Sequence, residues 1–317
     1  MFWLYILIFF VSVIVLIYSG GKAVAALTRI SRFLKMREFI VAFILMAFAA
    51  SVPELFVGIS SAINGIPELS LANILGANII NLTLAVGLAV LFLGGLEIER
   101  ETVRRGSILM GAIGLLPLLL IIDGDLSRID GCILILSFIF YLSWIFDRKE
   151  FFKKVYEGTE SAIINFKSFL KDLGIFIGAV ILLLLSSQGI VQSASFFANF
   201  LGVGLGFIGI ILVGAGTALP EVYFSIRAGR AGETKMILGN LMGCVVITST
   251  LVLGLVALIS PIKITDFSPY GTARLFLLLA VLFFLVVSRS QNRISKKEGL
   301  FLIIVYLIFI LAQTLLR

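Results

Sequence analysis

The chain has 317 residues, of which 60% are hydrophobic and only 14% are charged. A soluble globular domain carries about 25% charged residues, so the composition excludes an ordinary soluble protein and indicates a chain that crosses a membrane several times. The sequence contains no histidine, which argues against zinc hydrolase chemistry and against the commonest general base.

Apolar runs recur along the chain without a long soluble insertion, and a run of about 20 residues is long enough to cross a bilayer as a helix. The first run, 2–21, has no basic leader and no small-residue cleavage site, so we expect a retained helix rather than a signal peptide. The runs predict ten transmembrane helices, at 2–21, 38–63, 69–93, 106–122, 130–146, 170–197, 203–228, 235–258, 272–288 and 299–316.

The basic residues predict the orientation of these helices. Twenty of the 25 lie in connections that follow odd-numbered helices, four lie on the opposite side, and Lys22 lies near the inner end of the first helix. Because basic residues accumulate on the cytoplasmic side, we expect a multi-pass protein of the cell membrane with both termini outside. The net charge of +7 then reflects orientation and contact with membrane lipids, and we expect no nucleic-acid partner.

The chain resembles itself at an offset of 167 residues, which carries Pro53-Glu54 onto Pro220-Glu221. The same offset carries Asn73 onto Asn240, Gly76 onto Gly243 and Gly87 onto Gly254. Each half has five predicted helices, an odd number, so the second copy enters the membrane from the opposite side. We therefore expect an all-α membrane protein built from two inverted five-helix repeats, 1–146 and 170–317, joined by a cytoplasmic linker, 147–169.

Glu54 and Glu221 are the only acidic residues that we place well inside a predicted helix. A carboxylate near the bilayer centre costs about 2.5–3.5 kcal/mol on insertion scales, so two at equivalent positions of a repeat indicate an ion site. Their two negative charges match one divalent cation.

Pro53 and Pro220 lie directly before these glutamates, and proline removes a helical hydrogen-bond donor. We therefore expect helices 2 and 7 to be broken at the two prolines. A break frees backbone carbonyls, which hard cations such as Ca²⁺ bind together with carboxylates. The freed carbonyls predicted as ligands are those of Ala47, Ala50 and Gly214.

An alternative assigns Glu54 a purely structural role, because Ser51-Val52-Pro53-Glu54 also fits a helix capping box. That interpretation requires a serine or threonine at the equivalent position of the second half. Ala218 stands there while Glu221 remains, so capping alone does not explain both acids.

A second repeated motif runs from Asn73 to Asn81 and from Asn240 to Thr248. Its amides at lipid depth predict side chains that face protein or a cavity, either as ion ligands or in hydrogen bonds between helices. Gly76 and Gly243 favour close helix packing. Two cysteines, Cys132 and Cys244, lie in apolar segments, where we interpret them as small buried side chains without a disulfide.

The paired Pro-Glu and Gly-Asn-x-x-Gly signatures and the five-plus-five layout resemble the cation/Ca²⁺ exchanger superfamily, in particular its sodium/calcium exchangers. The resemblance covers essentially the whole chain. It implies that helices 2, 3, 7 and 8 surround the ions, that helices 1 and 6 slide across this core, and that Glu54 and Glu221 hold Ca²⁺ and share Na⁺. The full predicted ligand set is Glu54, Glu221, Ser51, Thr217, Ala47, Ala50, Gly214, Asn78, Asn81 and Thr248.

The chain departs from the family pattern at the hydroxyl ligands expected beside the glutamates. Of six such positions, only Ser51 and Thr217 keep a hydroxyl. Ala50, Ala77, Ala218 and Cys244 stand at four where the family has Thr or Ser, and Thr248 stands where an acidic residue is expected. These losses leave the divalent site intact on sequence grounds and weaken the sites for Na⁺.

Three hypotheses follow: an antiporter that exchanges Ca²⁺ or a related divalent cation for Na⁺ by alternating access, the same antiporter driven by H⁺ through protonation of the glutamates, and, remotely, an intramembrane hydrolase. A channel fits an inverted repeat with broken helices less well. We expect no enzyme activity and no cofactor. The expected partners are the transported cations and membrane lipids, with the monomer as the functional unit.

Overall fold

The computed structural model describes residues 1–33, 49–97, 100–146, 166–230, 234–264, 266–290 and 293–315, and in these residues the chain is almost entirely helical. Within these described residues, eight helical stretches are long and apolar enough to cross a membrane. They are Phe2–Ile30, Glu68–Leu93, Gly106–Asp123, Ser168–Leu201, Leu205–Arg227, Ile237–Ile259, Ser268–Val286 and Lys296–Leu315. The prediction of a helical multi-span membrane protein is therefore confirmed.

The first half of the chain contains helices that fall in the predicted segments. They are α1 (Phe2–Phe33), α3 (Ala49–Ile63), α4 (Glu68–Ile80), the π-helical turn η2 (Asn81–Ala85), α5 (Val86–Leu93), α6 (Arg100–Gly114), α7 (Leu116–Leu120), the 3₁₀ turn η3 (Ile121–Asp123) and α8 (Arg128–Phe146). The predicted linker lies outside the described residues except for its last part, which already belongs to the next helix.

The second half is also almost entirely helical in the described residues. It comprises α10 (Phe166–Leu201), α11 (Leu205–Ile208), the π-helical turn η4 (Gly209–Val213), α12 (Gly214–Arg230), α13 (Thr234–Ile247), the π-helical turn η5 (Thr248–Val252), α14 (Leu253–Ile259), α15 (Ser268–Ser290) and α16 (Lys296–Leu315). The turns η2 and η5 begin and end exactly 167 residues apart, at the offset of the sequence repeat.

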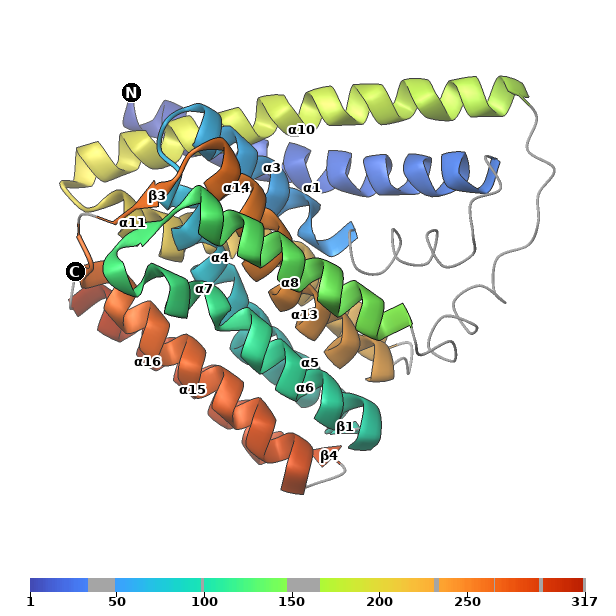
Figure 1. Ribbon diagram of the computed structural model, residues 1–317, viewed down its shortest axis with the longest axis vertical. Coiled ribbons are helices and arrows are strands. Elements are labelled where there is room, and N and C mark those ends of the chain that lie inside the picture. Colours follow the sequence, from blue (N-terminus) through green and yellow to red (C-terminus); the bar gives the residue numbers. More distant parts are fainter. Residues whose placement is uncertain are drawn as a thin grey trace.

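The helices are arranged in three groups (Figure 1). Helices α1 and α10 pack side by side along one edge, and α15 and α16 lie at the opposite edge next to α5 and α6. Between them lie α3, α4, α12 and α13, and both chain termini lie at the same end of the helices. The stretches from α4 to α5 and from α13 to α14 are largely buried by their neighbours, whereas α1, α10 and α16 are largely exposed.

Helices α1 and α10 are longer than predicted. They contain 32 and 36 residues, so at 1.5 Å per residue they are about 48 and 54 Å long, against a hydrocarbon core of about 30 Å. The first helix was predicted to end at 21, before Lys22. Helical hydrogen bonding continues past this lysine to Phe33, because a long basic side chain at a membrane boundary reaches the polar interface without interrupting the helix. Helix α10 begins four residues before the predicted span 170–197 and ends four residues after it.

The predicted breaks at Pro53 and Pro220 are not present. Pro53 lies inside α3 and Pro220 lies inside α12, and both helices continue through the proline. Membrane helices tolerate a proline where neighbouring helices and hydroxyl side chains satisfy the freed backbone groups. In the second half the helical irregularity is instead the π-helical turn η4, which ends directly before α12.

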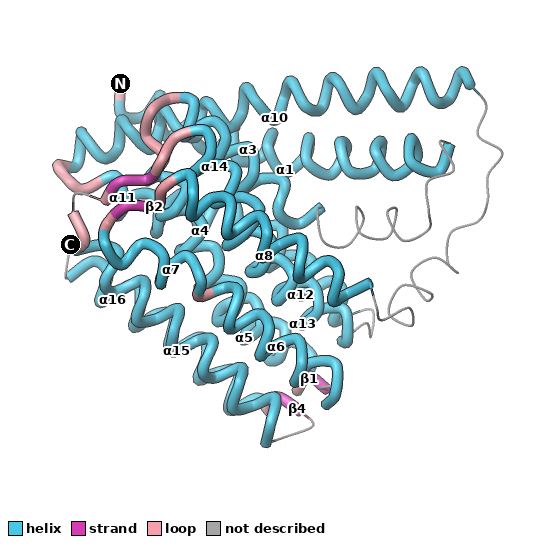
Figure 2. The backbone as a smooth tube through the Cα atoms, in the orientation of Figure 1, coloured by secondary structure: helices cyan, strands magenta, loops and turns pink. Residues whose placement is uncertain are grey.

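In the part of the chain that the structure describes, four two-residue strands pair the connections between helices, and the sequence did not predict them (Figure 2). They are β1 (Leu96–Glu97), β2 (Asp125–Leu126), β3 (Ile262–Lys263) and β4 (Arg293–Ile294). Strand β1 pairs antiparallel with β4, and β2 pairs antiparallel with β3. The connection after the third predicted helix is thus joined to the one after the ninth, and the connection after the fourth to the one after the eighth.

Candidate cation site

Glu54 and Glu221 are brought together at the centre of the protein, one on α3 and the other on α12. Both side chains are buried, and the two carboxylates are close enough to interact electrostatically. Both oxygens of Glu54 and the Oε2 of Glu221 have no hydrogen-bond partner among the described residues. An ionised carboxylate that is buried without a partner is strongly unfavourable, so this pair requires a cation or a proton.

Cys244 connects Glu221 to the neighbouring helices. Its thiol donates to Glu221 Oε1 at 3.6 Å, and its sulfur accepts from Ser51 Oγ at 3.5 Å and from Asn81 Nδ2 at 3.6 Å. Cys244 is buried and forms no disulfide, as predicted, and it also bonds three polar side chains. Cys132 is exposed on α8, so its predicted burial is wrong.

Asn81 lies at the start of η2 and contributes a further unpaired oxygen. Its amide nitrogen bonds Cys244, while its Oδ1 has no hydrogen-bond partner in the described part of the chain. In a π-helical turn the backbone repeat widens locally, and such turns are frequent at functional sites. Four buried oxygens, three from the two glutamates and one from Asn81, thus lack donors on helices that surround one thiol.

Asn78 and Thr248 form a separate polar group. Thr248 Oγ1 donates to Asn78 Oδ1 at 2.9 Å, and Asn78 Nδ2 donates to Ser249 Oγ at 3.0 Å. These bonds join α4 to η5 and use both polar ends of the Asn78 amide. Sequence reasoning missed Ser249, because serine in an apolar segment gives no signal until its partner on another helix is known.

Thr217 and Asn73 form a third contact between the halves. Thr217 Oγ1 donates to Asn73 Oδ1 at 2.9 Å and also lies 3.5 Å from the carbonyl oxygen of Gly214. The predicted carbonyl ligand Gly214 therefore already has a hydroxyl beside it. Ala47 lies outside the described residues, as does the side chain of Ala50, although the backbone of Ala50 belongs to α3.

Close backbone contact holds η4 and the start of α12 against α4 at this level. A Cβ atom on Gly76 would lie 2.0 Å from the carbonyl oxygen of Ile210, and one on Gly214 would lie 3.0 Å from the backbone nitrogen of Ala77. The predicted packing role of Gly76 is confirmed. A Cβ atom on Gly243 would meet only Tyr141 Oη, at 4.0 Å, so that glycine is not required for a comparably close approach.

The charge at the site comes from two carboxylates rather than from a cluster typical of resident metals. In the described part of the chain, no three His, Cys, Asp or Glu side chains gather in a way that suits a metal ion. The other candidate ligands among the described residues are the neutral side-chain oxygens of Ser51 and Asn81. Such a site suits a hard cation that binds and leaves, because oxygen ligands hold Na⁺ or Ca²⁺ without fixed stereochemistry.

Comparison with known proteins agrees with this arrangement. Residues 4–146 and 171–315 match the family described as sodium/calcium exchanger protein. The chain belongs to the sodium/calcium exchanger family. Membership confirms the predicted function, a membrane antiporter of the sodium/calcium exchanger type, and it confirms that the protein is not an enzyme.

Individual relatives match along almost the whole chain. Inner membrane protein YrbG of Escherichia coli is 26% identical over 299 residues, which cover 92% of this chain and 91% of YrbG. Sodium/calcium exchanger MaX1 of Methanosarcina acetivorans is 24% identical over 349 residues, covering 96% and 97%. Among solved structures, the sodium-calcium exchanger NCX_Mj soaked with 2.5 mM Na⁺ and 0.1 mM Ca²⁺ has a TM-score of 0.63 at 24% identity and covers 97% of each chain. The exchanger fold therefore extends over the full length.

Proposed function

We propose that this family member exchanges one Ca²⁺, or a related divalent cation, held between Glu54 and Glu221, for Na⁺ by alternating access. The observation that carries the proposal is the pair of buried carboxylates, three of whose four oxygens lack hydrogen-bond partners among the described residues. A divalent cation supplies the two positive charges that this pair requires. The exchanged ions are substrates, and the proposal needs no cofactor.

The proposed ligands of the divalent cation are the oxygens nearest to the two glutamates. Asn81 Oδ1 is buried without a hydrogen-bond partner among the described residues, and Ser51 lies on the same helix as Glu54, so both suit direct contact. The hydroxyl of Thr217 is a further proposed ligand toward the six to eight oxygens that Ca²⁺ prefers. The carbonyls of Ala50 and Gly214 are left out of the proposed set, because α3 and α12 continue through Pro53 and Pro220 and do not free them, and Ala47 lies outside the described residues. Asn78 and Thr248 bond each other and act by holding α4 against η5.

The halves 1–146 and 170–317 are proposed to be inverted repeats related by a pseudo-two-fold axis, with 147–169 as the cytoplasmic linker. The offset of 167 carries β1 onto β3 and β2 onto β4 within one residue, which exchanges the two observed strand pairs. The same offset, to within one residue, relates two close contacts between glycines. A Cβ atom on Gly87 would lie 2.8 Å from Gly299 O, and one on Gly131 would lie 2.9 Å from Gly254 O.

The proposed topology has ten transmembrane helices and both termini outside. Each strand pair joins two connections that the prediction places on the same side of the membrane, β1 with β4 and β2 with β3. Both termini lie at the same end of the helices. The excess of basic residues then assigns β1 and β4 to the cytoplasm. Helices α1 and α10 pack more extensively on each other than on the core. This packing supports their movement as one unit during alternating access.

A second candidate is an H⁺-driven exchanger of the same divalent cation. It is favoured by Cys244, whose thiol bonds Glu221 where the family pattern has a hydroxyl. Sulfur is a softer ligand than oxygen and serves Na⁺ poorly. Without strong Na⁺ sites, protonation of the two glutamates would release the divalent cation instead.

Flux measurements separate the two candidates. The protein is reconstituted into proteoliposomes that are loaded with Na⁺, and the membrane potential is clamped. Uptake of ⁴⁵Ca²⁺ is then measured first under a Na⁺ gradient and afterwards under a pH gradient. We expect uptake that follows the Na⁺ gradient with a sigmoidal dependence and that is indifferent to the pH gradient. Uptake that follows only the pH gradient would establish the second candidate.

A further inference from the structure

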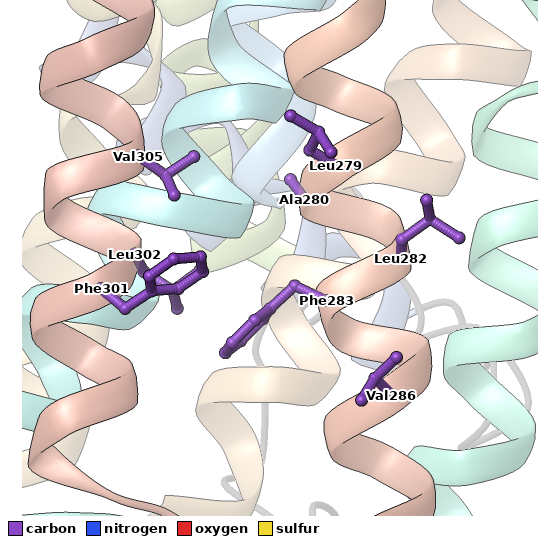
Figure 3. A pocket seen from close by; sticks show the side chains of 8 residues that line it. All are labelled: Leu279, Ala280, Leu282, Phe283, Val286, Phe301, Leu302 and Val305. Atoms are coloured by element: carbon purple, nitrogen blue, oxygen red, sulfur yellow. The ribbon is translucent and has the colours of Figure 1, made fainter.

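An apolar crevice of about 300 Å³ lies between α15 and α16 on the outer surface of the helix bundle. Its lining contains no polar side chain and consists of Leu279, Ala280, Leu282, Phe283, Val286, Phe301, Leu302 and Val305. Figure 3 shows the rings of Phe283 and Phe301 turned into the space between the two helices. Ala280 and Leu302 are buried at its floor, whereas Leu282 and Val286 are exposed at its rim. The crevice therefore opens toward the surrounding membrane.

Basic side chains lie where the crevice meets the connection between its two helices. Lys297 precedes Phe301 by four residues on α16 and so lies on the same face of that helix, one turn closer to the membrane boundary. Lys296 and Lys297 are exposed. Neither forms an ion pair with a residue that the structure describes.

Two other charged side chains that the structure describes at this end, Glu298 and Arg293, already have hydrogen-bond partners. Glu298 Oε2 accepts hydrogen bonds from the backbone nitrogen of Ser295 at 2.7 Å and from its hydroxyl at 2.8 Å, as the cap of α16. Arg293 Nη2 donates to the carbonyl oxygen of Gly94 at 2.6 Å across the β1–β4 pair. Among the side chains described at the mouth of the crevice, Lys296 and Lys297 therefore carry positive charge without an ion-pair partner.

We propose that the crevice binds one anionic phospholipid, with an acyl chain between α15 and α16 and the phosphate at Lys297. An apolar concave surface that opens to the bilayer suits a hydrocarbon chain, and basic residues at the end of such a groove bind anionic lipid head groups. On the proposed orientation this end faces the cytoplasmic leaflet. The site is separate from the cation site, so it does not depend on which ion drives exchange.

Native mass spectrometry of the delipidated full-length protein tests the site, with phosphatidylglycerol and phosphatidylcholine as probes. We expect the tightest phosphatidylglycerol site to have an affinity about fivefold higher than the tightest phosphatidylcholine site, because one lysine near an anionic group has an effect of this size. Lys297→Gln should remove this preference. Lys171→Gln, which removes an exposed charge from the distant helix α10, should keep it.

A second pair of variants tests the acyl-chain part of the site. Val286→Trp fills the rim of the crevice and should weaken binding of both lipids, whereas Leu311→Trp, at an exposed position of α16 outside the lining, should not. Equal binding of the two lipids by the unmodified protein, or an unchanged preference in Lys297→Gln, would overturn the proposal. The proposal would also be overturned if the unmodified protein formed a dimer without bound lipid and Val286→Trp dissociated that dimer. The face would then bind a second copy of the chain.

Discussion

Replacing Glu54 by Gln should abolish high-affinity binding of the divalent cation while leaving the protein folded. The substitution keeps the size of the side chain and removes one of the two charges at a fully buried site. Breaking a buried charge pair by removing one partner costs about 3–5 kcal/mol. With about 1.4 kcal/mol for each factor of ten, the dissociation constant should rise by roughly two to four orders of magnitude.

Two properties of the same variant distinguish a lost ligand from a damaged fold. In the ion-free protein, the carboxylate oxygens of Glu54 are buried without hydrogen-bond partners among the described residues, which lowers the free energy of unfolding. The neutral amide should therefore leave the thermal stability of the ion-free protein equal or raise it. Added Ca²⁺ should raise the melting temperature of the unmodified protein, because a ligand that binds only the folded state stabilises it, and should not raise that of the variant.

The assay is equilibrium ⁴⁵Ca²⁺ binding to purified protein in detergent, followed by exchange in proteoliposomes. Glu221→Gln should behave in the same way. Glu68→Gln is the matched control, because it removes one half-buried carboxylate from the start of α4, outside the cluster around Cys244. Ca²⁺ binding by Glu54→Gln within a few-fold of the unmodified protein, at equal expression, would refute the reasoning.

The remaining predictions concern orientation, the driving ion and packing. In a background without native cysteines, a cysteine introduced beside Asp125 should react with an impermeant thiol reagent from outside and one beside Lys153 only from inside; the reverse pattern would invert the topology. Cys244→Ser should lower the Na⁺ concentration for half-maximal exchange by about fivefold, or about 1 kcal/mol, because a hydroxyl is the better Na⁺ ligand; an unchanged Na⁺ dependence would show that the thiol is not beside a Na⁺ site. Gly76→Ala should destabilise the protein by about 1–3 kcal/mol or more in thermal unfolding, because its methyl group would lie 2.0 Å from a backbone oxygen. Gly21→Ala, with open space around it, is the control, and equal melting temperatures of the two variants would contradict the close contact.

The general architecture and the two glutamates could be predicted from the sequence, because both depend on strong local signals. Apolar runs determine which segments enter the membrane, and a carboxylate within such a run has few roles other than ion binding or proton transfer. The repeat supplied a second, independent signal, since Glu54 and Glu221 occupy equivalent positions. Their mutual approach in the structure agrees with that interpretation.

Features that depend on contacts between helices could not be predicted in the same way. A cysteine in an apolar run looks like a packing residue, and the family resemblance only places Cys244 where a hydroxyl is expected. Its hydrogen bonds to Ser51, Asn81 and Glu221 became visible only in the structure. The π-helical turns have no distinct composition, because they arise from a shift of backbone hydrogen bonds. The prediction of helix breaks at Pro53 and Pro220 was wrong, because neighbouring groups in a membrane protein can satisfy the backbone carbonyls that a proline leaves without a hydrogen bond.

The most direct measurement of the central claim is anomalous scattering from crystals of this protein soaked with Sr²⁺ as a stand-in for Ca²⁺. The proposal predicts one strong peak within about 2.3–2.6 Å of oxygens from both Glu54 and Glu221, the range expected for Ca²⁺ ligands. The peak should disappear in crystals of Glu54→Gln. A peak that touches only one of the two carboxylates, or that persists unchanged in the variant, would contradict the claim that the pair holds the transported cation.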